Sequence, residues 1–230
     1  MSDDGPDGGG FAVVGTGTGV GKTVVTAAAV ARLRSAGHDA RGIKPVQTGH
    51  PPDDDASVVA EACGDDAAAV CFERLEPPLA PTVAARETGT TLDYAAIRDR
   101  CRRAVDDAGV GVVEGIGGLR VPLAGDREVV DLVADLGLPA LVVGRSGLGT
   151  LNHTALTVDA LRDCGVPVCG VVLDAYAGET VAERTNPEVL AGMLGRDVET
   201  LPAVDTGGPA SVARTLADRV PASVLPDGLP

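Results

Sequence analysis

The chain has almost no aromatic residues and carries a strong excess of negative charge. Trp is absent, Phe and Tyr occur twice each, and aromatic residues make up 2% of the 230 residues. Proteins that hold single-stranded nucleic acid stack its bases on aromatic side chains, so the composition argues against that class. A formal net charge of −14 also opposes binding to a phosphate backbone, and we expect no nucleic acid partner.

Long apolar runs and metal-binding clusters are missing as well. No run approaches the roughly 20 apolar residues of a membrane-spanning helix, and residues 1–10 are acidic and Gly-rich, unlike a secretory signal. The five cysteines include no CxxC pair and the three histidines stand apart, so neither a zinc site nor a disulfide framework is indicated. We expect a cytoplasmic protein with reduced thiols and no membrane partner.

Lysine is the rarest charged residue. Only Lys22 and Lys44 occur among the 19 basic residues, and Asp outnumbers Glu by 23 to 10. An Asp-rich surface suits a protein that works at high salt, where negative charge maintains solubility. Codon bias is the alternative, although replacing Lys by Arg does not by itself explain the charge of −14. Because ammonium and guanidinium groups fit different sites, the two remaining lysines are candidates for functional positions.

Alternating strand-like and helical patterns predict the fold class. Strand-like runs lie at 11–14, 40–46, 110–113, 140–143 and 166–173, and helical patterns at 22–36, 55–63, 92–108, 128–136, 151–164 and 211–220. Apolar strands that alternate with helices form parallel sheets covered on both sides. We predict an α/β fold in one domain at 11–205, with a parallel sheet flanked by helices on both faces. A disordered acidic arm at 1–10 precedes this domain, and a C-terminal helix and tail at 206–230 follow it.

A Gly-rich loop, GTGTGVGKT at 15–23, lies between the first predicted strand and helix. Its glycines let successive N–H groups point at phosphate oxygens, and the helix N-terminus adds partial positive charge. Lys22 would then reach the β- and γ-phosphates, and the Thr23 hydroxyl would bind Mg²⁺. The loop is one residue longer than the usual phosphate-binding pattern, because Thr16 stands at the first Gly position. A dinucleotide fingerprint is excluded, since its third Gly is absent.

Further polar residues follow the other predicted strands. In an open α/β sheet the carboxyl ends of the strands form the active edge, so Lys44 and Thr48 should face the phosphate loop. Glu114 ends a buried strand, where it could bind Mg²⁺ or polarise water. Asp55 fits a second magnesium ligand, but beside Asp53 and Asp54 it equally fits acidic surface or a helix N-cap. Its spacing does not decide between them.

The segment 144–154 again leads from a strand through glycines to a helix N-terminus. This geometry binds anions such as a substrate carboxylate. His153 lies in the first turn of the predicted helix, where we expect it to cap or pack rather than to catalyse.

Together these segments resemble one known family. GTGTGVGKT, GIKPVQTG, VVEGIGGLRVPL, VVGRSGLGTLNHT and GVVLDAY occur in the order and spacing of the dethiobiotin synthetases, between about 11 and 204. The resemblance implies a P-loop NTPase-like fold and an ATP- and Mg²⁺-dependent cyclo-ligase of biotin biosynthesis. One amine of 7,8-diaminopelargonate takes up CO₂ as a carbamate, ATP phosphorylates the carbamate, and the second amine closes the ring. The resemblance also implies a homodimer.

The same resemblance assigns roles to residues of this chain. Lys44 and Lys22 are implied to be catalytic, and Thr23, Asp55 and Glu114 to bind magnesium. The implied nucleotide-binding residues are Gly19, Val20, Gly21, Lys22, Thr23, Val24, Asp55, Glu114, Gly115, Ile116, Gly117, Asp174, Ala175, Pro202, Ala203 and Val204. The implied substrate-binding residues are Thr18, Thr48, Gly149, Thr150, Leu151 and Asn152, the last four acting across the dimer interface.

Two positions depart from the family pattern: Gly17 replaces a usual acid, and Asp174 replaces a usual Asn. The alternative function is a partitioning-type or regulatory P-loop ATPase without synthetase activity. Partitioning ATPases carry a second lysine early in the phosphate loop, and residues 16–19 contain none. Related amidating enzymes carry an added glutaminase domain, for which this chain is too short.

Overall fold

The structure is a computed structural model that describes residues 9–205 and 207–229. Its centre is a seven-stranded sheet in the order β3-β2-β4-β1-β7-β8-β9, with every neighbouring pair parallel. These strands are β1 (Gly9–Gly15), β2 (Ala40–Thr48), β3 (Ala69–Leu75), β4 (Val110–Glu114), β7 (Ala140–Arg145), β8 (Val168–Tyr176) and β9 (Glu199–Pro202). A separate antiparallel pair joins β5 (Pro122–Ala124) to β6 (Arg127–Glu128).

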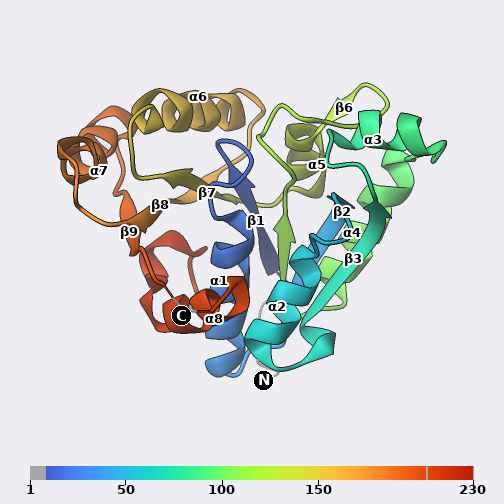
Figure 1. Cartoon of the computed structure of the whole chain (residues 1–230), viewed down its shortest axis with the longest axis horizontal. Coiled ribbons are helices and arrows are strands. Elements are labelled where there is room, and N and C mark those ends of the chain that lie inside the picture. The colour runs from blue at the N-terminus through green and yellow to red at the C-terminus, as the bar shows by residue number, and fades with distance from the viewer. Residues whose placement is uncertain (1–8, 206, 230) are drawn as a thin grey trace, which may run out of the picture.

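Within residues 9–205 and 207–229, eight α-helices surround the sheet (Figure 1). They are α1 (Lys22–Ser35), α2 (Asp55–Cys63), α3 (Pro81–Thr88), α4 (Tyr94–Asp106), α5 (Val129–Leu136), α6 (Thr150–Asp163), α7 (Val181–Leu194) and α8 (Pro209–Leu216). Three short 3₁₀ helices complete the described structure: η1 (Asp66–Ala68), η2 (Ala217–Arg219) and η3 (Ala222–Val224).

The two faces of the sheet bury separate apolar cores. Phe11 and Val13 of β1 point to one face and pack with α1, α2 and α8. Ala12 and Val14 alternate with them, point to the other face and pack with α3 to α7. Side chains of a strand alternate between faces, so a strand buried on both sides must be apolar throughout. The predicted fold class, a parallel sheet flanked by helices on both faces, is confirmed.

The strand register brings the carboxyl ends of the central strands together. Val13 of β1 lies beside Glu114 of β4, and Ile43 of β2 lies beside Val113. The phosphate loop that follows β1 therefore starts next to the end of β4 and close to Lys44. This edge of the sheet carries the site described below.

The start of the domain differs from the prediction. Most of the proposed arm lies outside the described residues, but Gly9 and Gly10 belong to β1 and pair with Val110 and Gly111 of β4. A side chain at Gly10 would place its Cβ 2.2 Å from the Gly111 carbonyl oxygen. Glycine at this position thus permits close strand pairing rather than disorder.

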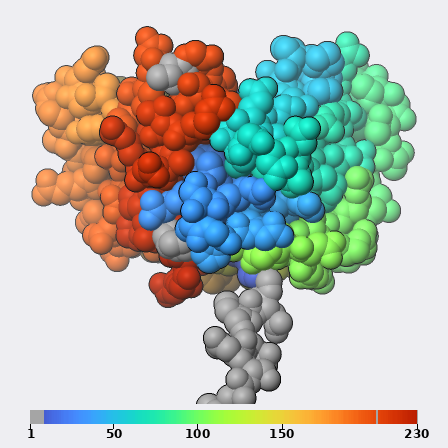
Figure 2. Space-filling model, turned by 90° about the horizontal axis from the view of Figure 1, so that it is seen from below, coloured from blue at the N-terminus to red at the C-terminus, as the bar shows by residue number. Residues whose placement is uncertain are grey.

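The C-terminal segment packs on the domain. Its helix α8 begins at Pro209, two residues before the predicted helix, because proline is favoured in the first turn of a helix. The Arg214 guanidinium donates to the Glu61 carbonyl oxygen of α2 at 2.7 Å. Seen from below, α1 lies between α2 and the C-terminal segment (Figure 2). None of the described helices is both long and apolar enough to span a bilayer.

Candidate functional site

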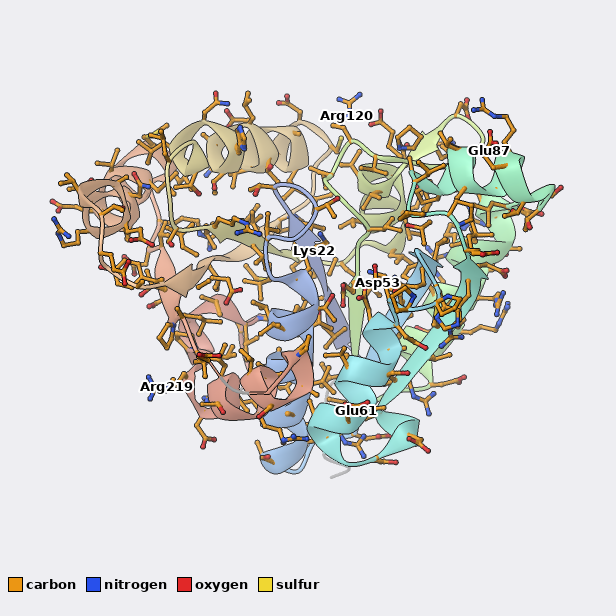
Figure 3. The ribbon with its side chains drawn as sticks, viewed as in Figure 1. Lys22, Asp53, Glu61, Glu87, Arg120 and Arg219 are labelled. Carbon is orange, nitrogen blue, oxygen red and sulfur yellow. The ribbon has the colours of Figure 1, made fainter. Side chains whose placement is uncertain are left out.

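A cleft of 1090 Å³ opens at the carboxyl edge of the sheet. Figure 3 shows Lys22 at the upper end of α1, with Asp53 across from it beside α2. Twelve of the residues predicted from the sequence line this one cleft: Thr18, Gly19, Gly21, Lys22, Thr23, Val24, Lys44, Thr48, Asp55, Glu114, Ile116 and Gly117.

Lys22 ties the phosphate loop to the turn that follows β4. Its Nζ donates to the carbonyl oxygens of Gly17 and Gly117, each at 2.8 Å. Burial, followed by repulsion from Lys44, lowers the pKa of Lys22 to about 8. A phosphate would offer this amine full negative charge in place of two neutral carbonyls. A Cβ at Gly17 would meet no atom within 4 Å. The position therefore has space for the acid that is usual in the family, and its absence disturbs no packing.

Lys44 lies at the centre of a buried ionic cluster. Its Nζ is 2.5 Å from Asp55 Oδ2, 3.0 Å from Glu114 Oε1 and 3.1 Å from the Gly115 carbonyl oxygen. Burial by itself disfavours the charge of Lys44. The attraction of Glu114 and Asp55 outweighs this effect and raises the pKa of Lys44 above its ordinary value. Lys44 is therefore a fixed cation facing the cleft.

Asp55 is not the cap of α2. The N-cap is Asp54, whose side chain accepts from the Ser57 backbone N–H at 3.2 Å. Asp55 follows as the first helical residue and turns towards Lys44. Its burial favours the neutral acid, but attraction to Lys44 prevails and lowers the pKa of Asp55. Gln47 supports the turn, because its Oε1 accepts from the Asp55 backbone N–H at 3.2 Å.

Thr23, Asp55 and Glu114 supply oxygen atoms that fit a magnesium ion. The Thr23 hydroxyl donates to Glu114 Oε1 at 2.9 Å, and the pKa of Glu114 is raised by burial despite the nearby Lys44. No group of three His, Cys, Asp or Glu converges anywhere in the described chain to form a complete metal site. Mg²⁺ keeps several waters and binds through one or two carboxylates plus phosphates, so a partial oxygen set suits it.

The predicted substrate loop lies outside this cleft. Gly149 is the N-cap of α6 with φ 93°, a left-handed conformation that glycine adopts without strain, and Thr150 begins the helix. None of Gly149, Thr150, Leu151 and Asn152 is among the cleft-lining residues. The loop instead presents Leu148, which is 99% exposed.

Hydrogen bonds from two residues that the sequence did not indicate hold this loop in place. The buried Asn186 of α7 donates from Nδ2 to the carbonyl oxygens of Ser146 and Gly147, at 2.8 and 3.0 Å. Arg145 donates to the Gly19 carbonyl oxygen of the phosphate loop at 2.5 Å. Neither residue carries a sequence signal for this role, because the partners are about 40 and 126 positions away.

One of the predicted nucleotide-binding residues, Asp174, lies beside the start of α1. Asp174 packs so closely on Gly21 that a Cβ there would lie 2.0 Å from Asp174 Oδ2. Burial raises the pKa of Asp174 to about 6. Ala175 has φ 54°, the only positive φ of a non-glycine residue within 9–205 and 207–229. The Ala203 N–H donates to the Tyr176 carbonyl oxygen at 3.0 Å, which ties the 202–204 segment to the end of β8.

Asp174, Ala175, Pro202, Ala203 and Val204 do not line the cleft, and neither do Val20 and Gly115. The Gly115 carbonyl oxygen nevertheless accepts from Lys44. Roles for these residues in binding nucleotide remain predictions.

Comparison with known proteins identifies close relatives. Residues 10–204 match a family model described as an AAA domain. The chain is 58% identical to the ATP-dependent dethiobiotin synthetase BioD of Haloferax mediterranei over 211 residues, which cover 92% of this chain and 91% of the relative. It is 34% identical to the enzyme of the same name from Aquifex aeolicus, covering 90% of this chain and 96% of the relative.

Solved structures with little sequence similarity share the fold. A ParA family ATPase from Chlorobium tepidum superposes with a TM-score of 0.58 at 15% identity, covering 94% of this chain and 95% of that one. The septum site-determining protein MinD from Pyrococcus horikoshii gives a TM-score of 0.56 at 14% identity, covering 92% and 95%.

Proposed function

The chain belongs to the family of ATP-dependent dethiobiotin synthetases, and we propose that its cleft closes the ureido ring of dethiobiotin. The substrates would be 7,8-diaminopelargonate, CO₂ and ATP, and the other products ADP and phosphate. One observation carries the assignment to this cleft: the buried Lys44, held by Asp55 and Glu114, faces the same space as Lys22 of the phosphate loop. We place the reaction in the cytoplasm, where ATP is available.

The chemistry requires concentrated positive charge. A carbamate and a triphosphate are both anions, so their approach is unfavourable unless cations are fixed in advance. In our proposal Lys22 exchanges its two carbonyl partners for the β- and γ-phosphates. Lys44 neutralises the carbamate and the phosphoryl group in transfer. A magnesium ion held by Thr23, Asp55 and Glu114 would neutralise the remaining phosphate charge.

The proposed reaction needs no reactant besides diaminopelargonate, CO₂ and ATP. A carbamate oxygen bonds to the γ-phosphorus as the bond to ADP breaks. The second amine then bonds to the carbamate carbon, phosphate leaves and the amine loses a proton. Lys44 and Thr48 both line the cleft, and in our proposal they orient the carbamate and the free amine. Positioning and charge neutralisation provide most of the rate acceleration in reactions of this kind.

A second subunit would complete the substrate site. Residues 149–152 do not line the cleft of their own chain, so they are available to receive a substrate carboxylate bound in a neighbouring cleft. Leu148 and Leu156 are 99% and 61% exposed, and Leu156 follows Asn152 by one helical turn on the same face of α6. We propose that these two exposed leucines lie in the contact surface of a homodimer.

Product analysis tests the proposal. The protein is incubated with diaminopelargonate, bicarbonate and Mg·ATP, and dethiobiotin is measured by mass spectrometry alongside phosphate release. We expect dethiobiotin, and phosphate only when diaminopelargonate is present. Steady phosphate release without diaminopelargonate and without product would support a partitioning-type or regulatory ATPase instead.

A further inference from the structure

A small cavity lies directly behind the ionic cluster of the cleft. Its volume is about 10 Å³, and its polar lining consists of Thr26, Lys44, Asp55 and Glu114. The remaining lining comes from β2 and α2. Lys44, Asp55 and Glu114 also line the cleft, so these three side chains form the partition between the two spaces.

Thr26 brings an unsatisfied hydroxyl to this cavity. It lies on α1, one turn after Lys22, and is 1% exposed. Among the described residues its Oγ1 is the only buried side-chain nitrogen or oxygen without a hydrogen-bond partner in the protein. A buried hydroxyl without a partner is costly, and native structures rarely leave one.

We propose that this cavity binds one water molecule, which links Thr26 to the carboxylates of Glu114 and Asp55. The water accepts from the Thr26 hydroxyl and donates one proton to each carboxylate, and three such bonds are typical of a buried water. The volume is close to the roughly 10–15 Å³ that one water needs. A hydrated metal cation does not fit the same space, because a volume of about 10 Å³ leaves no room for the waters that such an ion keeps.

The water gives Thr26 a positioning role. Glu114 Oε1 already accepts from Lys44 and Thr23 on the cleft side, and the proposed water holds the carboxylates from the opposite side. Removing it would let Glu114 and Asp55 turn, and Lys44 would lose its fixed location. The positioning role rests on the proposed function, whereas the water site itself does not.

Thermal unfolding of Thr26→Val tests the site, because the two possible states of the cavity predict opposite signs. If the water is bound, Val removes the hydroxyl that donates to it. The water and the two carboxylates then lack a hydrogen-bond partner, and Tm falls. If the hydroxyl has no partner, Val removes an unsatisfied polar group and Tm rises. Thr26→Ser keeps the hydroxyl and should lower Tm less than Val does. Thr157→Val is the matched control, since Thr157 donates to the His153 carbonyl oxygen within α6 and lines neither the cleft nor the small cavity.

We expect Tm to fall in Thr26→Val by more than in Thr157→Val. A crystal structure of the wild type should show water density within hydrogen-bond distance of Thr26 Oγ1, absent in Thr26→Val. A rise in Tm, or a wild-type cavity without density, overturns the proposal.

Kinetics test the positioning role separately. At saturating Mg²⁺, Thr26→Val should lower kcat about tenfold, because Lys44 is displaced. It should also raise the Mg²⁺ concentration needed for half-maximal activity, because the proposed magnesium ligands Asp55 and Glu114 turn. Thr26→Ser should restore kcat. An unchanged kcat in Thr26→Val overturns the positioning role. A wild-type protein that makes no dethiobiotin but shows the expected Tm and density refutes the proposed function and leaves the water site standing.

Discussion

Replacing Asp174 by Asn should stabilise the folded protein near neutral pH and leave it unchanged in acid. Burial raises the pKa of Asp174 from 3.8 to about 6. The folded state therefore prefers the protonated side chain. Stability from this group is fully present below the unfolded pKa of about 4 and is lost as pH rises through about 6. Asn resembles the protonated acid in shape and carries no charge at any pH.

The pKa shift of Asp174 sets the size of the expected gain in unfolding free energy. A difference of about 2 pKa units corresponds to about 3 kcal/mol at 1.36 kcal/mol per unit, and the partial exposure of the side chain makes this an upper bound. Asn keeps an oxygen that can accept from the Ala175 N–H. This hydrogen bond and the charge of Arg145 lower the pKa of Asp174, but burial outweighs them. Its similar size also preserves the packing on Gly21, so the charge is the main change.

Urea unfolding of wild type and Asp174→Asn at a series of pH values measures this difference. We expect the variant to be about 2–3 kcal/mol more stable at about pH 7.5, with the gain disappearing near pH 4. A gain that does not depend on pH, or a loss at pH 7.5, would refute the reasoning.

The same variant tests whether Asp174 reads the base. An Asn can both accept from and donate to adenine, whereas a carboxylate only accepts and suits the two adjacent donors of guanine. We expect GTP or other triphosphates to support turnover in the wild type, and Asp174→Asn to shift the preference towards ATP. If the wild type uses ATP alone and the variant matches it with all four ribonucleoside triphosphates, Asp174 does not read the base.

Four further predictions concern the cleft and the subunit interface. Lys22→Ala and Lys44→Ala should both abolish ring closure. Calorimetry should show weaker ATP binding, by about tenfold or more, only for Lys22→Ala, since a charge-assisted hydrogen bond contributes about 1.5–3 kcal/mol; normal turnover by Lys44→Ala would remove Lys44 from the mechanism. Glu114→Gln should raise the Mg²⁺ concentration needed for half-maximal activity about tenfold, because a neutral amide binds hard cations poorly; an unchanged titration would assign Glu114 a structural role. Leu156→Glu should convert a sedimenting dimer into an inactive monomer, whereas the half-exposed Val189 of α7 provides a control in Val189→Glu that should stay dimeric. We also expect the wild-type dimer to weaken at low salt, where the charge of −14 is less screened, and an active wild-type monomer would contradict the interface.

The sequence predicts the central strands and the helices that cover them because their patterns are local. Five strands and helices α1, α2, α4, α5 and α6 agree with the predicted ranges to within a few residues. The elements that were missed have weak patterns. The edge strand β3 is half-buried and carries Glu73 and Arg74. Helix α7 contains Pro187 in its interior, and β9 has only four residues.

The phosphate loop could be predicted because its motif consists of nine consecutive residues. Lys44 could be predicted because the sequence contains only two lysines. The sequence did not decide the role of Asp55, because whether Asp54 or Asp55 caps α2 depends on the exact residue at which the helix begins. The ties from Asn186 and Arg145 depend on strands and helices that meet only in the folded chain. Periodicity and motifs are local patterns, so they do not predict long-range contacts of this kind.

The fate of an oxygen atom tests the central claim most directly. In the proposed reaction a carbamate oxygen, which comes from CO₂, attacks the γ-phosphorus and leaves with the released phosphate. A short incubation with ¹⁸O-labelled bicarbonate, diaminopelargonate and Mg·ATP should therefore transfer one labelled oxygen to the phosphate formed with each dethiobiotin. Phosphate that carries no label from bicarbonate, and takes its new oxygen from water, would show that the cleft only hydrolyses ATP.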